Sequence, residues 1–435
     1  MTTTRKQYWF LFVLTLVVTL NYVDRYVLSI LVEPIRLELD LSDTQIGLLT
    51  GAAFALFYST LAIPIARLAE RYNRLLILFG AVLIWSVATA ACGLAGGFLM
   101  LLLARIFVGV GEAGAMAPSM SMLADVFPIE KRGTIMGLFA LGAPLGGALA
   151  PLLGGWLEPA IGWRATFFVL GGAGLPLALL LVATVREPRR GLADGLEKSP
   201  IAVPFREAAR RLFRRRTFAL LTPALILMAL GEYSMILWMP AFFQRTFDIA
   251  PTDLGAQIAL YQGLPFFLGT LAGGIFVDRL AKRDQRWMVW LPALGAILTV
   301  PVVLMLFASN TASMAFALLI LPSAVNGLYI APSYALVQNL SAVHSRATAA
   351  AILTFTVTIV GAGLGPFLLG ALSDFLSSQY GNQSLRYAFF SLVPMYALAA
   401  FLFTFIGSSL VRDIEDARSD SLSGIDDQAP VTAAA

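Results

Sequence analysis

Two pairs of charged residues interrupt apolar stretches of the chain that are otherwise long enough to cross a membrane. Asp24 and Arg25 are adjacent in the first stretch, and Arg105 and Glu112 lie seven residues apart in the fourth. A charged side chain at the centre of a bilayer costs roughly 3 kcal/mol, so ionisable residues in spans usually serve a function. A carboxyl group there can take up and release a proton, and a guanidinium can bind an anion. These four residues are therefore candidates for proton exchange and anion recognition.

Helical spacing predicts how these residues pair. Adjacent helix residues point about 100° apart, so we expect Asp24 and Arg25 to have separate partners on other helices. Arg105 and Glu112 share one helix face but lie about 10 Å apart, too far for a direct bond. Low dielectric and a nearby carboxylate favour a neutral carboxyl group, whereas a nearby arginine favours the charged one. We expect Glu112 to be the main proton-coupling residue and Asp24 the second, because Arg25 adjoins Asp24 and can hold it ionised.

Substrate recognition is expected around the same charges. Arg25 and Arg105 are the basic residues deep in the spans, so they are expected to bind an anionic group. Glu232 is the acid deep in the seventh span, and it either lines the substrate path or hydrogen-bonds a neighbouring helix. The second half is otherwise apolar and aromatic at the centre of its spans, which suits an amphipathic substrate. For the charges of the first and fourth spans, the alternative is a static network that staples the two helices together.

The composition predicts an all-α integral membrane protein. The 435-residue chain is 58% hydrophobic and 13% charged, whereas soluble domains are about 25% charged. Twelve stretches are long and apolar enough to span as helices, and they are too long and uniformly apolar for the strands of a barrel. They cover residues 8–35, 43–67, 75–97, 98–126, 131–157, 163–186, 217–245, 252–279, 286–309, 311–341, 345–374 and 384–411. Residues 42–45, Ser-Asp-Thr-Gln, predict a capping box that opens the second span.

Charge placement predicts the topology. Basic residues gather at one end of the predicted spans, and the opposite end carries only four, namely Arg36, Arg164, Arg245 and Arg386. This asymmetry places both termini in the cytoplasm. We expect a six-helix bundle over 1–190, a basic amphipathic linker over 191–216, a second six-helix bundle over 217–411 and a polar tail over 412–435. The basic charge is explained by topology and anionic lipid, so no nucleic-acid partner is expected, and the protein is expected to be a monomer.

A short pattern repeats in the two halves. Residues 66–71 end the second span with Glu70-Arg71, and residues 274–279 end the eighth with Asp278-Arg279. We expect these four residues, together with Arg132, to form ion pairs between the halves that make and break as a gate. The alternative is ordinary helix-end charge that follows the topology. Two six-span repeats around a site at the membrane midplane are typical of transporters.

Enzymatic and cofactor chemistry is not expected. The single histidine and the single cysteine, Cys92, argue against a His/Cys metal site, and we find no nucleophile–base pair or nucleotide-binding P-loop. Residues 109–114 read GVGEAG and match a dinucleotide fingerprint by spacing. That fingerprint needs a preceding strand, so these glycines are expected instead to let a neighbouring helix approach closely.

Several of these motifs resemble the major facilitator superfamily over residues 5–412. The loop after the second span matches the family signature at Leu68, Ala69 and Arg71 and departs from it at Ala66 and Glu70. The fourth span carries the family's arginine-and-glycine motif at residues 105–111. Residues 21–26, NYVDRY, and residues 109–113, GVGEA, are similar to the spinster branch of lipid-related transporters. The first of these two motifs is shared with organic-anion symporters of the superfamily.

The resemblance implies a secondary active transporter that works by alternating access and is coupled to protons. It points to an amphipathic lipid as substrate, such as a lysophospholipid or a sphingosine-phosphate-like molecule, and adds Asn21 and Tyr26 to the substrate-binding residues. The expected location is a bacterial inner membrane. Two alternatives stay open: a proton-coupled symporter of a small organic anion, and an integral membrane enzyme that acts on lipids.

Overall fold

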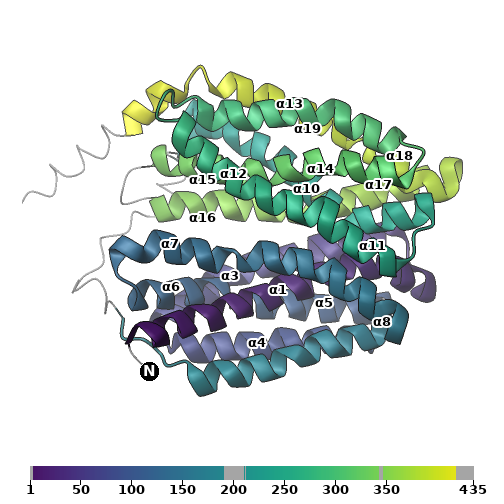
Figure 1. Ribbon diagram of the computed structural model, residues 1–435, viewed down its shortest axis with the longest axis horizontal. Helices are drawn as coiled ribbons and strands as arrows, with labels where there is room; N and C mark the ends of the chain where they lie inside the picture. Colours follow the sequence, from purple (N-terminus) through teal and green to yellow (C-terminus); the bar gives the residue numbers. More distant parts are fainter. Residues whose placement is uncertain (1–2, 191–209, 211, 342–345, 418–435) are drawn as a thin grey trace, which may run out of the picture.

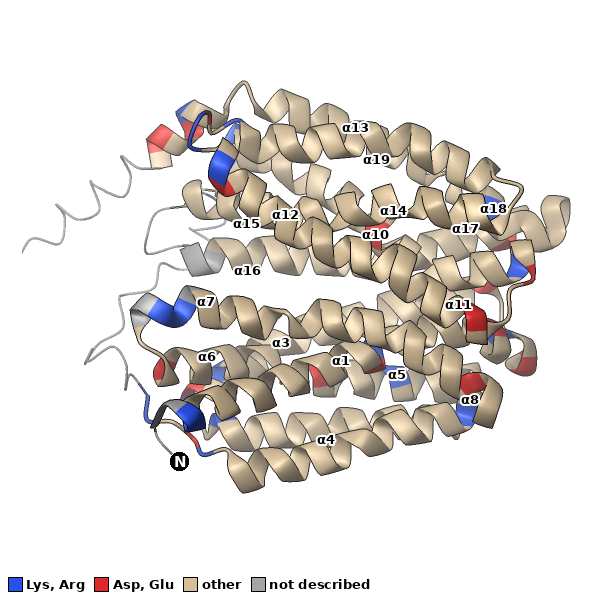
Figure 2. Ribbon diagram, in the orientation of Figure 1, with Lys and Arg blue, Asp and Glu red and all other residues tan. Residues whose placement is uncertain are grey.

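The computed structural model describes residues 3–190, 210, 212–341 and 346–417. All regular elements in these residues are helices, and they run roughly parallel to one axis in two bundles that lie side by side (Figure 1). We call the end where α1 and α10 begin the inner end, and the opposite one the outer end. Most charged residues lie at these two ends, and few lie along the middle (Figure 2).

The first bundle contains the helices up to residue 184. They are α1 (Thr3–Leu39), α2 (Asp43–Gly47), the π-helical turn η1 (Leu48–Ala52), α3 (Ala53–Arg71), α4 (Arg74–Cys92), α5 (Phe98–Glu112), α6 (Met116–Val126), α7 (Ile129–Ala140) and α8 (Gly142–Thr184). The predicted capping box is confirmed: the Ser42 hydroxyl accepts from Gln45 N, and the Gln45 side chain accepts from Ser42 N.

The second bundle begins at residue 216. It contains α10 (Arg216–Phe247), α11 (Pro251–Ile258), the π-helical turn η2 (Ala259–Gly263), α12 (Leu264–Leu280), α13 (Trp287–Ala308), α14 (Ala312–Leu328), α15 (Ile330–Asn339), α16 (Arg346–Val357), the π-helical turn η4 (Thr358–Leu364), α17 (Gly365–Tyr380), the 3-10 turn η5 (Gly381–Gln383), α18 (Ser384–Phe389) and α19 (Leu392–Ile406). Most of the predicted linker, 191–209 and 211, lies outside the described residues, as does the tail from 418.

Ten continuous helical stretches among the described residues are long and apolar enough to cross a membrane. Two of them are long enough to cross twice, Thr134–Thr184 with 51 residues and Ala349–Ile406 with 58, since one crossing needs about 20. The first is broken at Gly162, whose φ of 78° is not helical, and the second turns at Gly381, with φ 52°. The described residues therefore have the all-helical membrane fold that the sequence predicts, and their stretches are long enough for twelve crossings.

Small residues let the helices pack closely. A Cβ on Gly111 would lie 2.5 Å from the backbone N of Trp85, and one on Gly171 would lie 2.5 Å from the N of Ala90. Gly111 and Gly114 therefore let α4 approach closely and Gly109 lies against Phe54 of α3, as predicted. No strand precedes them among the described residues.

The two bundles meet closely toward the outer end. There α2 packs on α17, the first arm of α8 packs on α11, and α1 packs on α10. Glycines make these contacts tight: a Cβ on Gly155 of α8 would lie 2.5 Å from Pro251 O and 2.9 Å from the Cα of Gly255 in α11. No larger side chain fits between the halves at this point.

Candidate functional site

The guanidinium of Arg25 in α1 binds the carboxylate of Glu112 at the end of α5. Arg25 Nε and Nη2 donate to Glu112 Oε2 at 2.9 and 2.6 Å, and Nη2 also donates to Asn21 Oδ1 at 3.3 Å. Arg25 is 9% exposed and Glu112 is fully buried. Removing one partner of a buried ion pair typically costs about 3–5 kcal/mol, because the other charge is left uncompensated. Neutralising Glu112 would therefore release Arg25 for another anion.

Aromatic rings surround the Arg25 guanidinium. Its Cζ lies 4.7 Å from the ring centroids of Tyr22 and Tyr58 and 4.9 Å from that of Phe54. The Tyr22 ring also packs on Tyr26, with centroids 5.8 Å apart. Such cation–π contacts stabilise a partly desolvated cation by about 0.5–2 kcal/mol each. The positive charge is thus held in surroundings that also accept apolar groups.

The carboxyl group of Asp24 is buried beside α4 and α5. The charged groups that act on it are Glu112 and Arg105 of α5, and Trp85 and Thr89 of α4 lie near it. Arg105 Nη1 lies 3.5 Å from the backbone carbonyl oxygen of Asp24, and the two residues are 1% and 0% exposed. Asp24 and Arg25 therefore both lie near Glu112, and Arg105 is the cation that acts on the Asp24 carboxyl group.

Buried polar atoms of this cluster lack hydrogen-bond partners within the described chain. They are Nδ2 of Asn21, both carboxyl oxygens of Asp24, Nε and Nη2 of Arg105 and Oε1 of Glu112. An unpaired buried polar atom costs about 1–3 kcal/mol, so most such atoms in proteins are paired. A network that only stapled α1 to α5 would satisfy these atoms. Their concentration favours a site that exchanges protons or binds a polar ligand.

Turns mark the middle of the span that carries this site and of its counterpart. α5 ends at Glu112, and α6 continues the span after the turn 113–115. In the second half, α14 and α15 are separated at Tyr329, whose backbone stays in the right-handed helical region. These are the fourth and tenth spans, which occupy the same place in the two six-span repeats, and each remains one continuous stretch. Irregular turns at matching places of two repeats favour a midplane binding site.

Tyr329 is hydrogen-bonded to the acid that the sequence singled out in the second half. Its hydroxyl donates to Glu232 Oε2 at 2.6 Å, and Glu232 is 6% exposed. Nearby, the Tyr396 hydroxyl donates to Asn326 Oδ1 at 3.2 Å. Glu232 therefore has the neighbouring-helix hydrogen bond that one of the two sequence interpretations requires, and no Lys or Arg among the described residues pairs with it.

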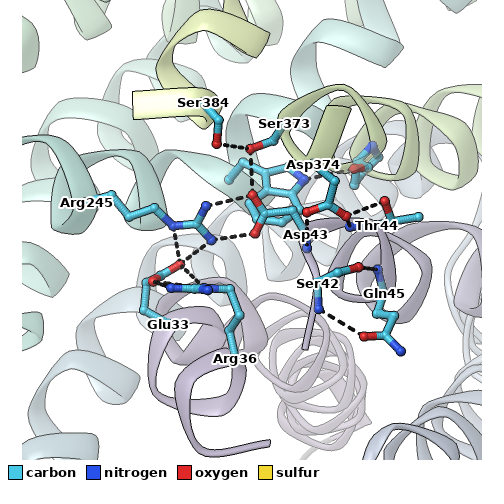
Figure 3. A network of polar contacts seen from close by, with 12 residues as sticks. Glu33, Arg36, Ser42, Asp43, Thr44, Gln45, Arg245, Ser373, Asp374 and Ser384 are labelled. Atoms are coloured by element: carbon cyan, nitrogen blue, oxygen red, sulfur yellow. Dashed lines mark hydrogen bonds and ion pairs between the residues drawn. The ribbon is translucent and has the colours of Figure 1, made fainter. Parts of the chain in front are cut away.

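A second charged network joins the two bundles at the outer end (Figure 3). We call it the outer lock; it consists of Glu33, Arg36, Asp43, Arg245, Ser373 and Asp374. Arg245 of α10 is its centre, and its guanidinium donates to Glu33 Oε1 at 2.6 Å and to both Asp43 carboxylate oxygens at 2.7 Å. Arg36 donates to the other Glu33 oxygen at 3.1 Å. Arg245 of the C-terminal half thus binds two acids of the N-terminal half, Glu33 and Asp43.

The first turn of α2 is capped from the opposite bundle. The Asp374 carboxylate of α17 accepts from the backbone N of Asp43 at 3.0 Å and of Thr44 at 2.7 Å. The Ser373 hydroxyl donates to Asp43 Oδ2 at 2.6 Å. The first N–H groups of a helix have no partner inside it, and they favour an anion. Asp374 therefore reinforces the outer lock through the backbone.

Comparison with known proteins decides the family. The sequence profile of the Major Facilitator Superfamily matches residues 14–366. The chain belongs to the major facilitator superfamily. An MFS-type efflux pump of Mycolicibacterium smegmatis is 32% identical over 93% of this chain and 94% of the relative. The hexuronate transporter of Bacillus subtilis is 27% identical over 82% and 85%.

A solved structure is similar to this transporter along almost its whole length. It is a bacterial homolog of the human lysosomal transporter Spinster, in its inward-facing and unoccupied conformation, with a TM-score of 0.87 and 28% identity over 94% of this chain and 98% of the other. The predicted family, helical membrane fold and spinster-like character are therefore confirmed, and this transporter is not an enzyme.

The residues predicted to gate this transporter at the inner end form no ion pairs with one another in the described structure. Glu70 and Arg71 lie at the end of α3, and Asp278 and Arg279 lie near the end of α12; all four are exposed. None makes an ion pair with another described residue. In an alternating-access cycle one gate is open while the other is closed, so their gating role stays a prediction.

A network within the first bundle occupies the inner end instead. Arg74, 1% exposed, binds Asp125 and also Glu187, with a distance of 2.7 Å from Nε to Glu187 Oε1. Arg132, a predicted gating residue, donates to the backbone carbonyl groups of Ala124 at 2.6 Å and Phe127 at 3.2 Å. These contacts brace the inner end of one bundle.

Sequence reasoning missed the outer lock. The sequence analysis used Arg36 and Arg245 only as two of the four basic residues at the outer end, and Asp43 only as part of a capping box. Glu33 lies three residues before Arg36, a spacing that allows a helical ion pair, and this was the available signal. Nothing local connects Asp374 with Asp43, because 331 residues separate them.

Proposed function

We propose that the chain is a proton-coupled secondary transporter that moves an amphipathic lipid with an anionic head group by alternating access. The bacterial inner membrane is the proposed location, with both termini in the cytoplasm. The observation that carries the proposal is the buried Arg25–Glu112 pair, which lies next to the turn in the middle of the fourth span. An anion binds Arg25 well only when the Glu112 carboxylate no longer pairs with it. Protonation of Glu112 should therefore raise the affinity of Arg25 for substrate, and bound substrate should raise the proton affinity of Glu112.

The two arginines differ in what they can reach. Arg25 is surrounded by aromatic rings and is 9% exposed, whereas Arg105 is 1% exposed and faces Asp24. We therefore assign the anionic head group to Arg25, and Arg105 becomes the counter-charge of Asp24. Asn21 and Tyr26 flank Arg25 on α1, and Glu232 with Tyr329 provides a hydrogen-bonding group from the other bundle.

The described conformation corresponds to the step in which the outer end is closed. The outer lock binds α1 and α2 to α10 and α17, and the inner gating residues make no ion pair with any described residue. In this step we expect Glu112 to be ionised, because two nitrogens of Arg25, Nε and Nη2, donate to its carboxylate. Outward opening would break the outer lock and bring the residues of Glu70-Arg71 and Asp278-Arg279 together.

Transport of a small organic anion is the second candidate function. The hexuronate transporter among the relatives supports it, and Arg25 would bind a carboxylate as readily as a phosphate. The aromatic rings around Arg25 and the few charges in the middle of the second bundle favour a lipid over a small organic anion as substrate.

The substrate class can be tested at Arg25. We expect Arg25→Gln to weaken binding of lysophosphatidic acid by about 10- to 100-fold, the value of one charge-assisted hydrogen bond, and to change binding of a monoacylglycerol of equal chain length less than threefold. Arg25→Lys should keep part of the affinity, and Arg105→Gln should have the smaller effect. The measurement is isothermal titration of the purified protein, with a carboxylate series as the comparison. Equal losses for both lipids would indicate a stapling role for Arg25, and tight binding of short carboxylates alone would favour the organic-anion symporter.

The coupling role can be tested separately at Glu112. We expect Glu112→Gln to mimic the protonated form and to flatten the pH dependence of the inner-end distance between spin labels at Tyr72 and Glu415, measured from pH 5 to 9. A tenfold difference in proton affinity between the two access states shifts their populations tenfold. Asp24→Asn should act in the same direction but more weakly, because Arg105 faces it. A pH-dependent shift in Glu112→Gln equal to that of the parent would remove Glu112 from the coupling role.

A further inference from the structure

A basic pocket lies between the inner ends of α12 and α13, in the second bundle. Its volume is about 640 Å³, and six residues line it: Phe276, Arg279, Leu280, Lys282, Arg283 and Leu291. Three of the six are cationic and three are apolar, and no acid lines the pocket. The lining thus combines the two surfaces that a lipid presents at a membrane boundary, a charged head and an apolar stem.

The positive charges of this pocket are not balanced by the chain. Arg279, Lys282 and Arg283 make no ion pair with any residue in the described part of the protein. The two acids nearest in sequence do not neutralise them: Asp278 is exposed without an ion pair, and Asp284 accepts a hydrogen bond from a backbone N–H. Three cations within five residues repel one another, so a bound anion would stabilise this segment.

The pocket opens toward the lipid-facing surface. α12 packs mainly on α14, α13 packs mainly on α19, and the two helices make little contact with each other. Apolar side chains are exposed along both helices further from the inner end, among them Ile275 and Leu268 on α12 and Leu294 and Leu298 on α13. An acyl chain that left the pocket would therefore lie on apolar side chains.

Two tryptophans place the pocket at the level of the lipid head groups. Trp287 and Trp290 form the first turn of α13, with ring centroids 5.7 Å apart, and the Arg286 guanidinium lies 6.0 Å from the Trp290 ring. Tryptophan is enriched at the membrane–water interface, where one side of the ring is apolar and the other is hydrated.

We propose that this pocket binds the phosphate of one anionic diacyl phospholipid from the adjacent leaflet. Arg279 and Arg283 provide guanidinium groups, whose planar forks match phosphate oxygens, and Lys282 adds a third charge. The acyl chains follow the exposed apolar residues of α12 and α13. Basic pockets between spanning helices suit acidic head groups in this way. The site does not depend on the transported substrate, since Arg25 and Glu112 lie in the other bundle.

The test is retention of lipid by the purified transporter in native mass spectrometry. Protein in mild detergent is mixed with phosphatidylglycerol or with phosphatidylcholine of the same acyl chains. We expect the parent to retain one phosphatidylglycerol in preference to phosphatidylcholine. Each charge removed should weaken that binding about fivefold, so the triple variant Arg279→Gln, Lys282→Gln, Arg283→Gln should retain almost none while still binding phosphatidylcholine as the parent does.

Two controls keep the result specific. The triple variant Arg67→Gln, Arg210→Gln, Arg214→Gln removes equal charge from exposed inner-end positions outside the pocket, and it should retain phosphatidylglycerol. Arg25→Gln should retain it as well. Equal loss in the first control would mean nonspecific attraction, and loss in Arg25→Gln alone would place the lipid in the substrate site; either result overturns the proposal. Release of the lipid by millimolar glycerol phosphate would show that the head group alone provides the binding, which also contradicts a diacyl ligand.

Discussion

Replacing Arg245 with glutamine is expected to open the outer end of the transporter. The variant leaves Glu33 and Asp43 buried, close to each other and without their shared cation, at a cost of about 3–5 kcal/mol. That cost applies only while the bundles are closed, because opening hydrates both acids. The outer-closed population should therefore fall by more than 100-fold. Spin labels at Leu94 and Gln379, in a Cys92→Ala background, would report a longer distance between the bundles.

Arg386 provides a matched control for this experiment. It also lies at the outer end, but it donates to the backbone carbonyl groups of Phe307 and Ser309 within its own bundle. Arg386→Gln removes the same charge and should leave the Leu94–Gln379 distance unchanged. Arg245→Lys keeps the charge but cannot contact both acids in the same geometry, so it should lie between the parent and Arg245→Gln. An unchanged distance in Arg245→Gln would show that apolar packing alone closes the outer end.

Replacing Gly155 with leucine is expected to prevent the outer end from closing by a different route. Even a Cβ at this position would overlap the backbone of α11, and backbone cannot move aside as a flexible side chain can. Overpacking typically costs about 1–3 kcal/mol and more against rigid atoms. The bundles should separate at this contact, the Leu94–Gln379 distance should lengthen, and transport should fall at least tenfold.

Gly172 in the second arm of α8 is the control for Gly155. No atom lies within 4 Å of a Cβ built on Gly172, so Gly172→Leu should fold and transport as the parent does. Gly155→Ala is the milder variant and should give a smaller opening. A parent-like Leu94–Gln379 distance and parent-like transport in Gly155→Leu would contradict this prediction. Close contact between α8 and α11 at Gly155 would then not be needed for gating.

Much of the fold follows from local sequence pattern. Long apolar stretches, the Ser42 capping box and the glycines of residues 109–114 act through lipid solvation, backbone hydrogen bonding and close packing, which depend on neighbouring residues. The different arginine partners of the two acids, Arg25 for Glu112 and Arg105 for Asp24, agree with the 100° between adjacent helix residues. The two spans that merge into α8 are separated by Gly162, where a change of φ rather than a loop turns the chain.

The partners of the charged residues could not be predicted from the sequence. Arg25 needed a partner on another helix, but the choice of Glu112, 87 residues away, depends on how α1 and α5 pack. The midspan turns at 113–115 and Tyr329 each precede a proline by three residues, Pro118 and Pro332, and this was the available signal for them. The outer lock draws on α1, α2, α10 and α17, and those helices are brought together only when the two bundles meet.

The cap on α2 makes the two halves incomplete without each other. Asp374 satisfies backbone groups of Asp43 and Thr44, so a helix of the N-terminal half is finished by a side chain of the C-terminal half. An acid at position 374 is therefore tied to the start of a helix in the other half. A chimera that took its second half from a relative without this acid would leave the first turn of the second span with only its Ser42 capping box, even if every helix of both parents were intact.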